Sequence, residues 1–197
     1  NSAVARCEGK ILCFVDAGLT PLSTDWLGEM IGFAIQPGIG AVGAKIVSRH
    51  HTVSGTALVL SGRSGALTAH EGLPSEAPGS MFRNLLVGNY SAVAFTCAAI
   101  RRELFIEAGG FDETGFPECM FDVDLCLRLL TRGYRVVYTP HAELQSASGY
   151  RAAFRTAEPS DSERNLFFER WGSMIGKDPF YNPNFSSNDG RFSIRLE

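Results

Sequence analysis

The residues best suited to chemistry lie in two acidic segments, Gly-Gly-Phe-Asp-Glu at 109–113 and Phe-Asp-Val-Asp-Leu-Cys-Leu-Arg at 121–128. The first segment predicts a helix end followed by an acidic loop, because Gly109 suits the left-handed conformation that closes a helix. The second segment has apolar residues at helical spacing, so Asp122 lies in the first turn of a helix, where backbone N–H groups stabilise negative charge. A carboxylate held there is well placed to act as a general base.

The same carboxylates also have a structural interpretation. An Asp that precedes an apolar helical run is a common N-cap, and this describes Asp122. Asp124 and Arg128 have the i,i+4 spacing of an ordinary helical ion pair. Spacing alone favours this interpretation, although one residue can serve both roles.

Strands and helices alternate around these segments. Residues 11–15 form a continuous apolar run, which predicts a buried parallel strand. A Ser-Asp-Ser-Glu capping box at 160–163 predicts the start of the last helix, and residues 61–79, rich in Gly, Ser and Pro, predict a mobile loop. Further strands are predicted at 41–47, 56–60, 91–100 and 135–138, and helices at 26–35, 101–108 and 160–174. This order indicates an α/β fold.

The composition indicates one globular domain spanning residues 1–197. Hydrophobic residues make up 45% of the chain, and the formal net charge of −3 lacks the basic excess that nucleic acid or an anionic membrane attracts. No apolar run reaches the roughly 18 residues of a membrane span, and no signal peptide is recognised. Five scattered cysteines favour a reducing, cytoplasmic protein without disulfides. Phe167, Phe168 and Trp171 predict a core face or a homo-oligomer contact.

Six segments in this order resemble the second half of a family-2 glycosyltransferase domain of the GT-A type, as found in bacterial polysaccharide assembly. They lie at 89–93, 101–105, 109–113, 122–128, 133–140 and 178–184, and the last one, Asp-Pro-Phe-Tyr-Asn-Pro-Asn, is closest to the rhamnosyltransferase-like branch. The resemblance implies a Rossmann-like, mixed, mainly parallel sheet flanked by helices. It also implies that the N-terminal nucleotide-binding strands of the GT-A domain lie outside this chain, which alone would then bind nucleotide weakly or not at all.

The resemblance further implies a division of the chain and a reaction. Residues 1–60 would end the donor-binding half, 61–150 form the acceptor-side half, and 151–197 form a C-terminal helix and an extended tail. The reaction would be inverting transfer of a hexosyl-type sugar from a nucleotide-diphosphate sugar to a saccharide or lipid-linked saccharide acceptor. It would serve surface polysaccharide or cell-wall glycan synthesis in the cytoplasm or at the inner face of the membrane.

Five residues receive roles on the acceptor side from this resemblance. Asp122 matches the family's catalytic base. Asp112 and Glu113 would face the acceptor, because short acidic side chains suit hydrogen bonds to sugar hydroxyls. Asn89 and Tyr90, at the entrance of the strand 91–100, would lie on the same surface. A solvated loop in which Asp112 caps a turn is the alternative interpretation of the acidic pair.

The metal side departs from the family pattern. The family places Asp-x-Asp after the strand that matches 11–15, and a His after the segment that matches 140–144. This chain has Asp16-Ala17-Gly18 at the first position and Gln-Ser-Ala-Ser at the second, so both usual protein ligands for Mg²⁺ or Mn²⁺ are missing. Asp16 remains as a donor or metal residue.

Several interpretations of this departure stay open. The diphosphate could hold the cation with Asp16 as the one protein anchor, or Arg151 and Arg155, in the segment that closes over the diphosphate, could replace the metal. The chain could instead be a catalytically degenerate relative with a binding or structural role. A nucleotidyltransferase on a similar α/β scaffold is a further alternative.

Overall fold

The computed structural model describes residues 1–55, 57–147, 158–186 and 189–194. The strands are β1 (Ile11–Val15), β2 (Leu19–Pro21), β3 (Ile39–Val47), β4 (Val53–Gly55), β5 (Ala57–Ser61), β6 (Gly65–Thr68), β7 (Gly88–Asn89), β8 (Ala92–Val93), β9 (Cys97–Arg101) and β10 (Arg135–Ser146). The α-helices are α1 (Trp26–Ala34), α2 (Arg102–Glu107), α3 (Phe121–Thr131) and α4 (Asp161–Ile175), and short 3-10 helices lie at Val4–Arg6 and Ser80–Phe82.

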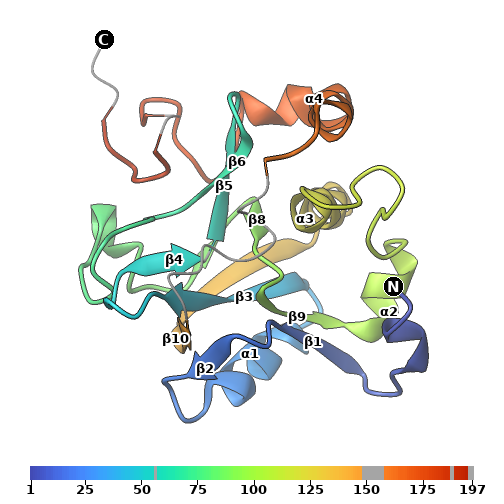
Figure 1. The fold of residues 1–197 in the computed structure, drawn as a ribbon, viewed down its shortest axis with the longest axis horizontal. Helices are drawn as coiled ribbons and strands as arrows, with labels where there is room; N and C mark the ends of the chain where they lie inside the picture. The colour runs from blue at the N-terminus through green and yellow to red at the C-terminus, as the bar shows by residue number, and fades with distance from the viewer. Residues whose placement is uncertain (56, 148–157, 187–188, 195–197) are drawn as a thin grey trace.

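The main sheet is mixed and has seven strands among the described residues. Its order is β1-β9-β3-β10-β2, with β4 paired to β3 and β7 paired to β10 (Figure 1). The long central ladder between β3 and β10 is parallel, while the ladders that flank it are antiparallel. A second, antiparallel sheet of three strands has the order β6-β5-β8.

Strand β3 lies at the centre of the main sheet, and both of its faces are covered. All nine of its residues are buried. Val42 and Ile46 pack in the same cluster as Met30 of α1, whereas Ala41 packs in the cluster that contains Val123 of α3. Successive side chains of a strand point to opposite faces, so α1 and α3 cover opposite faces of the sheet. Figure 1 shows this layering, with α1 below the sheet and α3, α4 and the small sheet above it.

The predicted α/β order with a mixed sheet flanked by helices is confirmed, and two of the predicted strands need correction. Residues 11–15 form β1, which is antiparallel to β9 and half-exposed instead of buried and parallel. The predicted strand 91–100 is two strands, β8 and β9, which belong to different sheets. An apolar run predicts the length of a strand. It does not predict the direction of the neighbouring strand or the point at which the chain passes from one sheet to another.

The chain after α4 returns across the small sheet. Asp178 accepts hydrogen bonds from the Leu60 amide and the Ser91 hydroxyl, both at 2.8 Å. Tyr181 and Phe192 then pack in one cluster with Tyr90. None of the helices in the described ranges is long and apolar enough to cross a membrane.

Candidate active site

Five phenylalanine rings, those of Phe14, Phe95, Phe105, Phe111 and Phe121, pack together beside β1. The Phe14 ring lies 5.2 Å from Phe95 and 5.4 Å from Phe111, measured between ring centroids. Phe111 also lies 5.3 Å from Phe95 and 5.1 Å from Phe121. Aromatic pairs at these separations make favourable tilted or edge contacts. The cluster therefore fixes the end of β1, the start of β9, the acidic loop and the start of α3 relative to one another.

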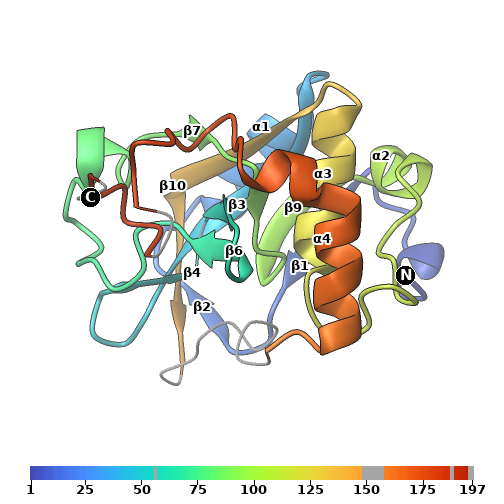
Figure 2. The ribbon, with the colours of Figure 1, turned by 90° about the horizontal axis from the view of Figure 1, so that it is seen from above.

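Three rings of this aromatic cluster are followed closely by a carboxylate. Asp16 comes two residues after Phe14, and Asp112 and Asp122 directly follow Phe111 and Phe121. Figure 2 shows β1, β9 and one end of α3 gathered on the same side of the molecule. Chain connectivity thus brings three of the carboxylates named from sequence to the border of one cluster, although they are up to 106 residues apart in sequence.

Asp122 is buried in the first turn of α3, with 4% of its surface exposed. Its Oδ1 accepts a hydrogen bond of 2.8 Å from the amide of Val123. The N-cap is Met120, which has the left-handed conformation with φ 62° and makes no side-chain cap. Asp122 is therefore not the helix cap, and its carboxylate lies among the N–H groups of the first turn.

The loop after β1 meets the end of β10. The amide of Asp16 donates to the Thr96 carbonyl at 2.8 Å, and its Oδ1 accepts from the Gly18 amide at 2.9 Å. The Gly18 carbonyl in turn accepts from the Ala147 amide at 2.9 Å. The two segments in which the family usually carries metal ligands are thus side by side, but Gly18 and Ala147 offer no side-chain oxygen.

A divalent cation would find one carboxylate at this junction. Within the described ranges, no three His, Cys, Asp or Glu side chains are grouped so as to hold a metal ion. Asp16 is a carboxylate at this junction that could anchor a cation, and the other ligands would have to come from a bound substrate or from water. Arg151 and Arg155 lie outside the described residues.

The two carboxylates of the acidic loop differ in their partners and in their exposure. Asp112 accepts from the Gly115 amide at 2.8 Å through Oδ1 and pairs with Arg170 at 3.0 Å through Oδ2. The Gly115 amide, together with the Arg170 guanidinium, lowers the pKa of Asp112. The Glu113 side chain is 62% exposed, and its Oε1 pairs with the N-terminal ammonium of Asn1 at 2.9 Å. Asp112 therefore caps a turn, as the alternative interpretation predicted.

Asn89 and Tyr90 do not share one surface. Asn89 is half-buried in β7 opposite Val137. Tyr90 is 1% exposed, and its ring packs edge-on against Tyr138 with centroids 5.8 Å apart. Burial raises the pKa of the Tyr90 hydroxyl. The expected acceptor contact of Tyr90 is not supported, because the tail with Phe192 folds back over this ring.

Known proteins similar to this chain include three from bacteria. No family model matches the chain. It is 35% identical to the uncharacterized protein y4gI of Sinorhizobium fredii, over 98% of the chain and 22% of that protein. It is 30% identical to the O-antigen biosynthesis protein RfbC of Myxococcus xanthus, over 94% of the chain and 15% of that protein. It is 33% identical to the pre-mycofactocin glycosyltransferase of Mycobacterium tuberculosis, over 72% of the chain and 28% of that protein.

A solved structure shares the fold. The crystal structure of GalNAc-T7 with UDP, GalNAc and Mn²⁺ superposes with a TM-score of 0.62 at 14% identity, over 86% of this chain and 33% of that one. The chain therefore has the GT-A fold of glycosyltransferases. The chain spans less than a third of the length of each of the three bacterial relatives named above.

Sequence reasoning missed the centre of polar contacts in this GT-A chain. Asp124 is fully buried and binds Arg128 Nε at 2.8 Å, Arg170 Nη1 at 2.8 Å and Trp171 Nε1 at 3.0 Å. The i,i+4 spacing predicted the Arg128 pair alone. Arg170 and Trp171 lie on α4, and no sequence spacing relates α3 to α4. The sequence therefore gave no indication of these two contacts. Trp171 and Phe167 are buried against this network, which confirms their predicted core role.

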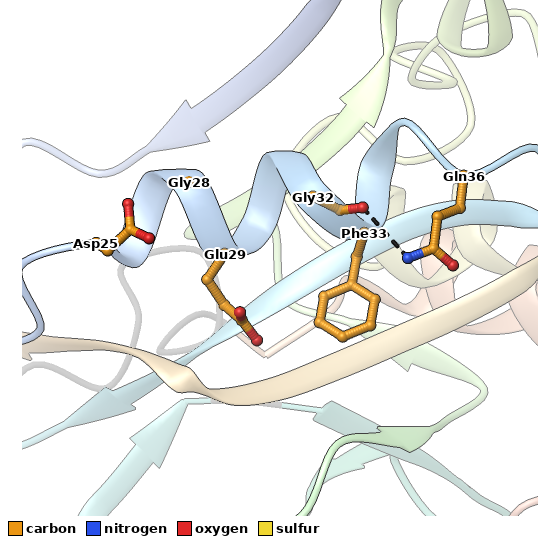
Figure 3. Close-up of a pocket in the computed structure, with 6 residues that line it drawn as sticks. All are labelled: Asp25, Gly28, Glu29, Gly32, Phe33 and Gln36. Carbon is orange, nitrogen blue, oxygen red and sulfur yellow. Dashed lines mark hydrogen bonds between the residues drawn. The ribbon is translucent and has the colours of Figure 1, made fainter.

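A surface hollow lies away from the aromatic cluster. It follows α1 and is lined by Asp25, Gly28, Glu29, Gly32, Phe33 and Gln36 (Figure 3). The Glu29 carboxylate there accepts from the Thr139 hydroxyl at 2.6 Å. Since α1 covers the face of the sheet opposite α3, this hollow does not adjoin Asp122.

Proposed function

We propose that this chain is part of an inverting glycosyltransferase that uses a nucleotide-diphosphate sugar and a saccharide or lipid-linked saccharide acceptor. The GT-A fold and the names of two relatives support a sugar transfer. The single observation that carries the proposal is the buried carboxylate of Asp122 in the first turn of α3. Asp122 and Asp16 each come just after a phenylalanine of the same aromatic cluster. The name of the RfbC relative, an O-antigen biosynthesis protein, favours surface polysaccharide synthesis. We further propose that the acceptor lies in the cytoplasm or at the inner face of the membrane.

The proposed chemistry needs a base on one side of the transferred sugar. As the acceptor oxygen bonds to the anomeric carbon, Asp122 takes the hydroxyl proton. The bond from the anomeric carbon to the diphosphate breaks, and its electron pair leaves with the diphosphate. Attack opposite to the leaving group inverts the configuration. Asp122 thus acts on the reacting hydroxyl itself.

Asp16 would serve the departing diphosphate. Mn²⁺ is present in the GalNAc-T7 structure, and a divalent cation bound here would neutralise charge on the diphosphate. One carboxylate suffices as an anchor where phosphate oxygens and water supply the other ligands. Arg151 and Arg155 stay proposed as the alternative source of positive charge.

Asp122→Asn in the full-length protein should lower turnover by at least about 100-fold, because the amide cannot accept the proton. The measurement is nucleoside diphosphate release from UDP-, GDP- and dTDP-sugars with a panel of saccharide acceptors, with and without Mn²⁺. Nucleotide affinity by calorimetry should be preserved, since a base acts in the transition state. The matched control is Asp161→Asn, which neutralises an exposed carboxylate in the first turn of α4.

A degenerate, binding-only domain is the second candidate function. The observation that favours it is the lack of a metal-holding group within the described ranges. It predicts equal turnover, at background level, for wild type and Asp122→Asn. Nucleotide binding that needs Mn²⁺ in calorimetry would favour the transferase, whereas binding without Mn²⁺ would favour the arginine alternative. No nucleotide binding would contradict the enzyme.

A further inference from the structure

Asp124 holds two arginines that point toward the acidic loop. The carboxylate has 0% of its surface exposed, and it accepts from Arg128 Nε through Oδ2 and from Arg170 Nη1 through Oδ1, both at 2.8 Å. Trp171 Nε1 donates to the same Oδ1 at 3.0 Å. All of the contacts are charge-assisted, and such bonds are roughly twice as strong as neutral ones. The buried carboxylate therefore fixes both guanidinium groups.

Arg128 ties the near end of the acidic loop. Its Nη1 donates to the carbonyl of Ala108, and its Nη2 donates to the carbonyl of Gly110 at 2.7 Å. Both carbonyls belong to the turn that closes α2, in which Gly109 and Gly110 have φ of 87° and 65°. Glycine adopts such positive φ angles at the lowest cost, because it has no Cβ atom. Arg128 thus holds a turn that the two glycines permit.

Arg170 ties the far end of the same loop. Its Nη2 pairs with Asp112 Oδ2 at 3.0 Å while its Nη1 stays on Asp124. The guanidinium also lies 5.2 Å from the centroid of the Phe116 ring. The planar, two-sided donor pattern of arginine allows one side chain to join two carboxylates, which lysine would do poorly.

The four charged groups balance one another. Asp112 and Asp124 carry two negative charges, and Arg128 and Arg170 carry two positive charges. A fully buried carboxylate is stable only when it is paired and hydrogen-bonded, so Asp124 depends on both arginines. Loss of either arginine would release one end of the loop and leave Asp124 incompletely paired.

We propose that Asp124, Arg128 and Arg170 form a clamp that positions the acidic loop, and that Asp112 belongs to this clamp instead of contacting the acceptor. Both oxygens of Asp112 are engaged, by the Gly115 amide and by Arg170. Glu113 has a 62% exposed side chain, and only its Oε1 makes a described ion pair, with the N-terminal ammonium of Asn1 at 2.9 Å. Glu113 is then the acidic residue that the loop presents to a saccharide. Because Asp124 lies two residues after Asp122, the clamp also sets the loop against the proposed base. This last role rests on the proposed function, whereas the clamp itself does not.

Hydrogen exchange measures the clamp without any substrate. Arg170→Met should speed exchange of the Gly115 amide by about fivefold or more, because the loop loses its tie to α3 and α4. Asp112→Asn is a milder change that should preserve the fold, and it should speed exchange of the Gly115 amide to a smaller degree. Arg164→Met on the same helix, whose partner Glu158 is exposed, should leave it unchanged. Amides of β3 should keep their protection in every variant. Unchanged Gly115 exchange in Arg170→Met would overturn the clamp.

Steady-state kinetics distinguishes the proposed role of Asp112 from that of Glu113. With methyl glycosides of rhamnose, glucose, galactose and mannose as acceptor probes, Glu113→Gln should raise the acceptor KM about fivefold or more with kcat retained. Asp112→Asn and Arg170→Met should lower kcat with little change in KM. A KM increase for Asp112→Asn as large as that for Glu113→Gln would overturn the assignment. If the wild type transfers no sugar, the proposed function is wrong. Hydrogen exchange of the Gly115 amide still tests whether the clamp exists.

Discussion

His70 is a buried histidine whose charged form the fold disfavours. It is 1% exposed, its ring stacks on Phe192 with centroids 4.8 Å apart, and its Nε2 lies 3.5 Å from the Tyr90 hydroxyl. Burial, with added repulsion from Arg83 and Lys45, lowers the pKa of His70 from 6.5 to about 4. The neutral ring thus belongs to the contact between the tail and the small sheet.

Acidification should destabilise the protein through His70. Since the folded pKa lies below the unfolded one, the unfolded chain binds more protons between pH 6.5 and pH 4. Stability is therefore complete above about pH 6.5 and falls as the pH drops toward 4. The free energy of unfolding at pH 5 should be about 2 kcal/mol lower than at pH 7, measured by urea denaturation.

The control for this slope is His70→Asn. Asn tolerates the left-handed conformation, with φ 61°, that His70 adopts. The variant should be less stable at pH 7 but should lose most of the decrease between pH 7 and pH 5. The exposed His50, His51 and His141 remain in it, so an unchanged slope would assign the effect to other groups.

Sequence predicted single positions well where the deciding contacts are local. Asp122 in the first turn of a helix follows from residues within one helical turn. The partners of Asp124 do not, because Arg170 lies 46 residues away on another helix. Tyr90 resembled a surface residue for the same reason, since the ring that covers it, Phe192, belongs to the far end of the chain.

The start of α4 does more than cap a helix. Ser160 Oγ accepts from the Glu163 amide at 3.3 Å, and Glu163 Oε2 accepts from the Ser160 amide at 3.0 Å, which completes the predicted capping box. Glu163 Oε1 also accepts from the amides of Glu118 and Cys119 at 3.0 and 2.8 Å. Burial opposes ionisation of Glu163, but these N–H donors lower its pKa overall. Glu163 therefore joins α4 to the chain that leads into α3.

Glu163→Gln should cost more stability than Ser160→Ala. The glutamine amide offers one oxygen and one NH₂ group, so at least one set of buried N–H donors would lose its acceptor, at about 1–3 kcal/mol. Loss of the serine cap should cost about 1 kcal/mol. Urea denaturation at pH 7 measures both free energies of unfolding. Equal costs would show that Glu163 contributes only to the capping box.

At the level of elements, helices followed from sequence more closely than strands. The spans predicted at 26–35 and 160–174 agree with α1 and α4 to within one residue at each end. Helical spacing and capping are local, so a single segment contains the information. Strand partners are not local, which is why residues 11–15 gave the right length and the wrong partner direction.

The two sheets of the molecule meet where the backbone of Gly43 lies close to the side chain of Val93. A Cβ atom added to Gly43 in the middle of β3 would lie 2.5 Å from Cβ of Val93 in β8. Strand β3 belongs to the main sheet and β8 to the small sheet. Glycine at 43 therefore permits the approach of the two sheets, above which α3 packs against β8 (Figure 1).

The overall architecture followed from the order of six motifs, since no single periodicity indicated it. The resemblance to GT-A domains predicted the fold that the superposition on GalNAc-T7 confirms. It did not predict that β8 leaves the main sheet, because residues 91–100 form one unbroken apolar pattern. The sheet junction depends on the close approach of Gly43 and Val93, which are 50 residues apart and share no local pattern.

Gly43→Ala should destabilise the protein by about 1–3 kcal/mol, because its methyl group overlaps the Val93 side chain and would push the sheets apart. In a Val93→Gly background the same change should cost less than about 1 kcal/mol, since the opposing Cβ is absent. A double-mutant cycle of urea denaturation measures the difference as a coupling energy. Gly32→Ala, where nothing lies within 4 Å of the added atom, is the control and should be neutral or stabilising, because alanine favours a helix over glycine. If Gly43→Ala costs the same in both backgrounds, the contact between Gly43 and Val93 does not set the spacing of the sheets.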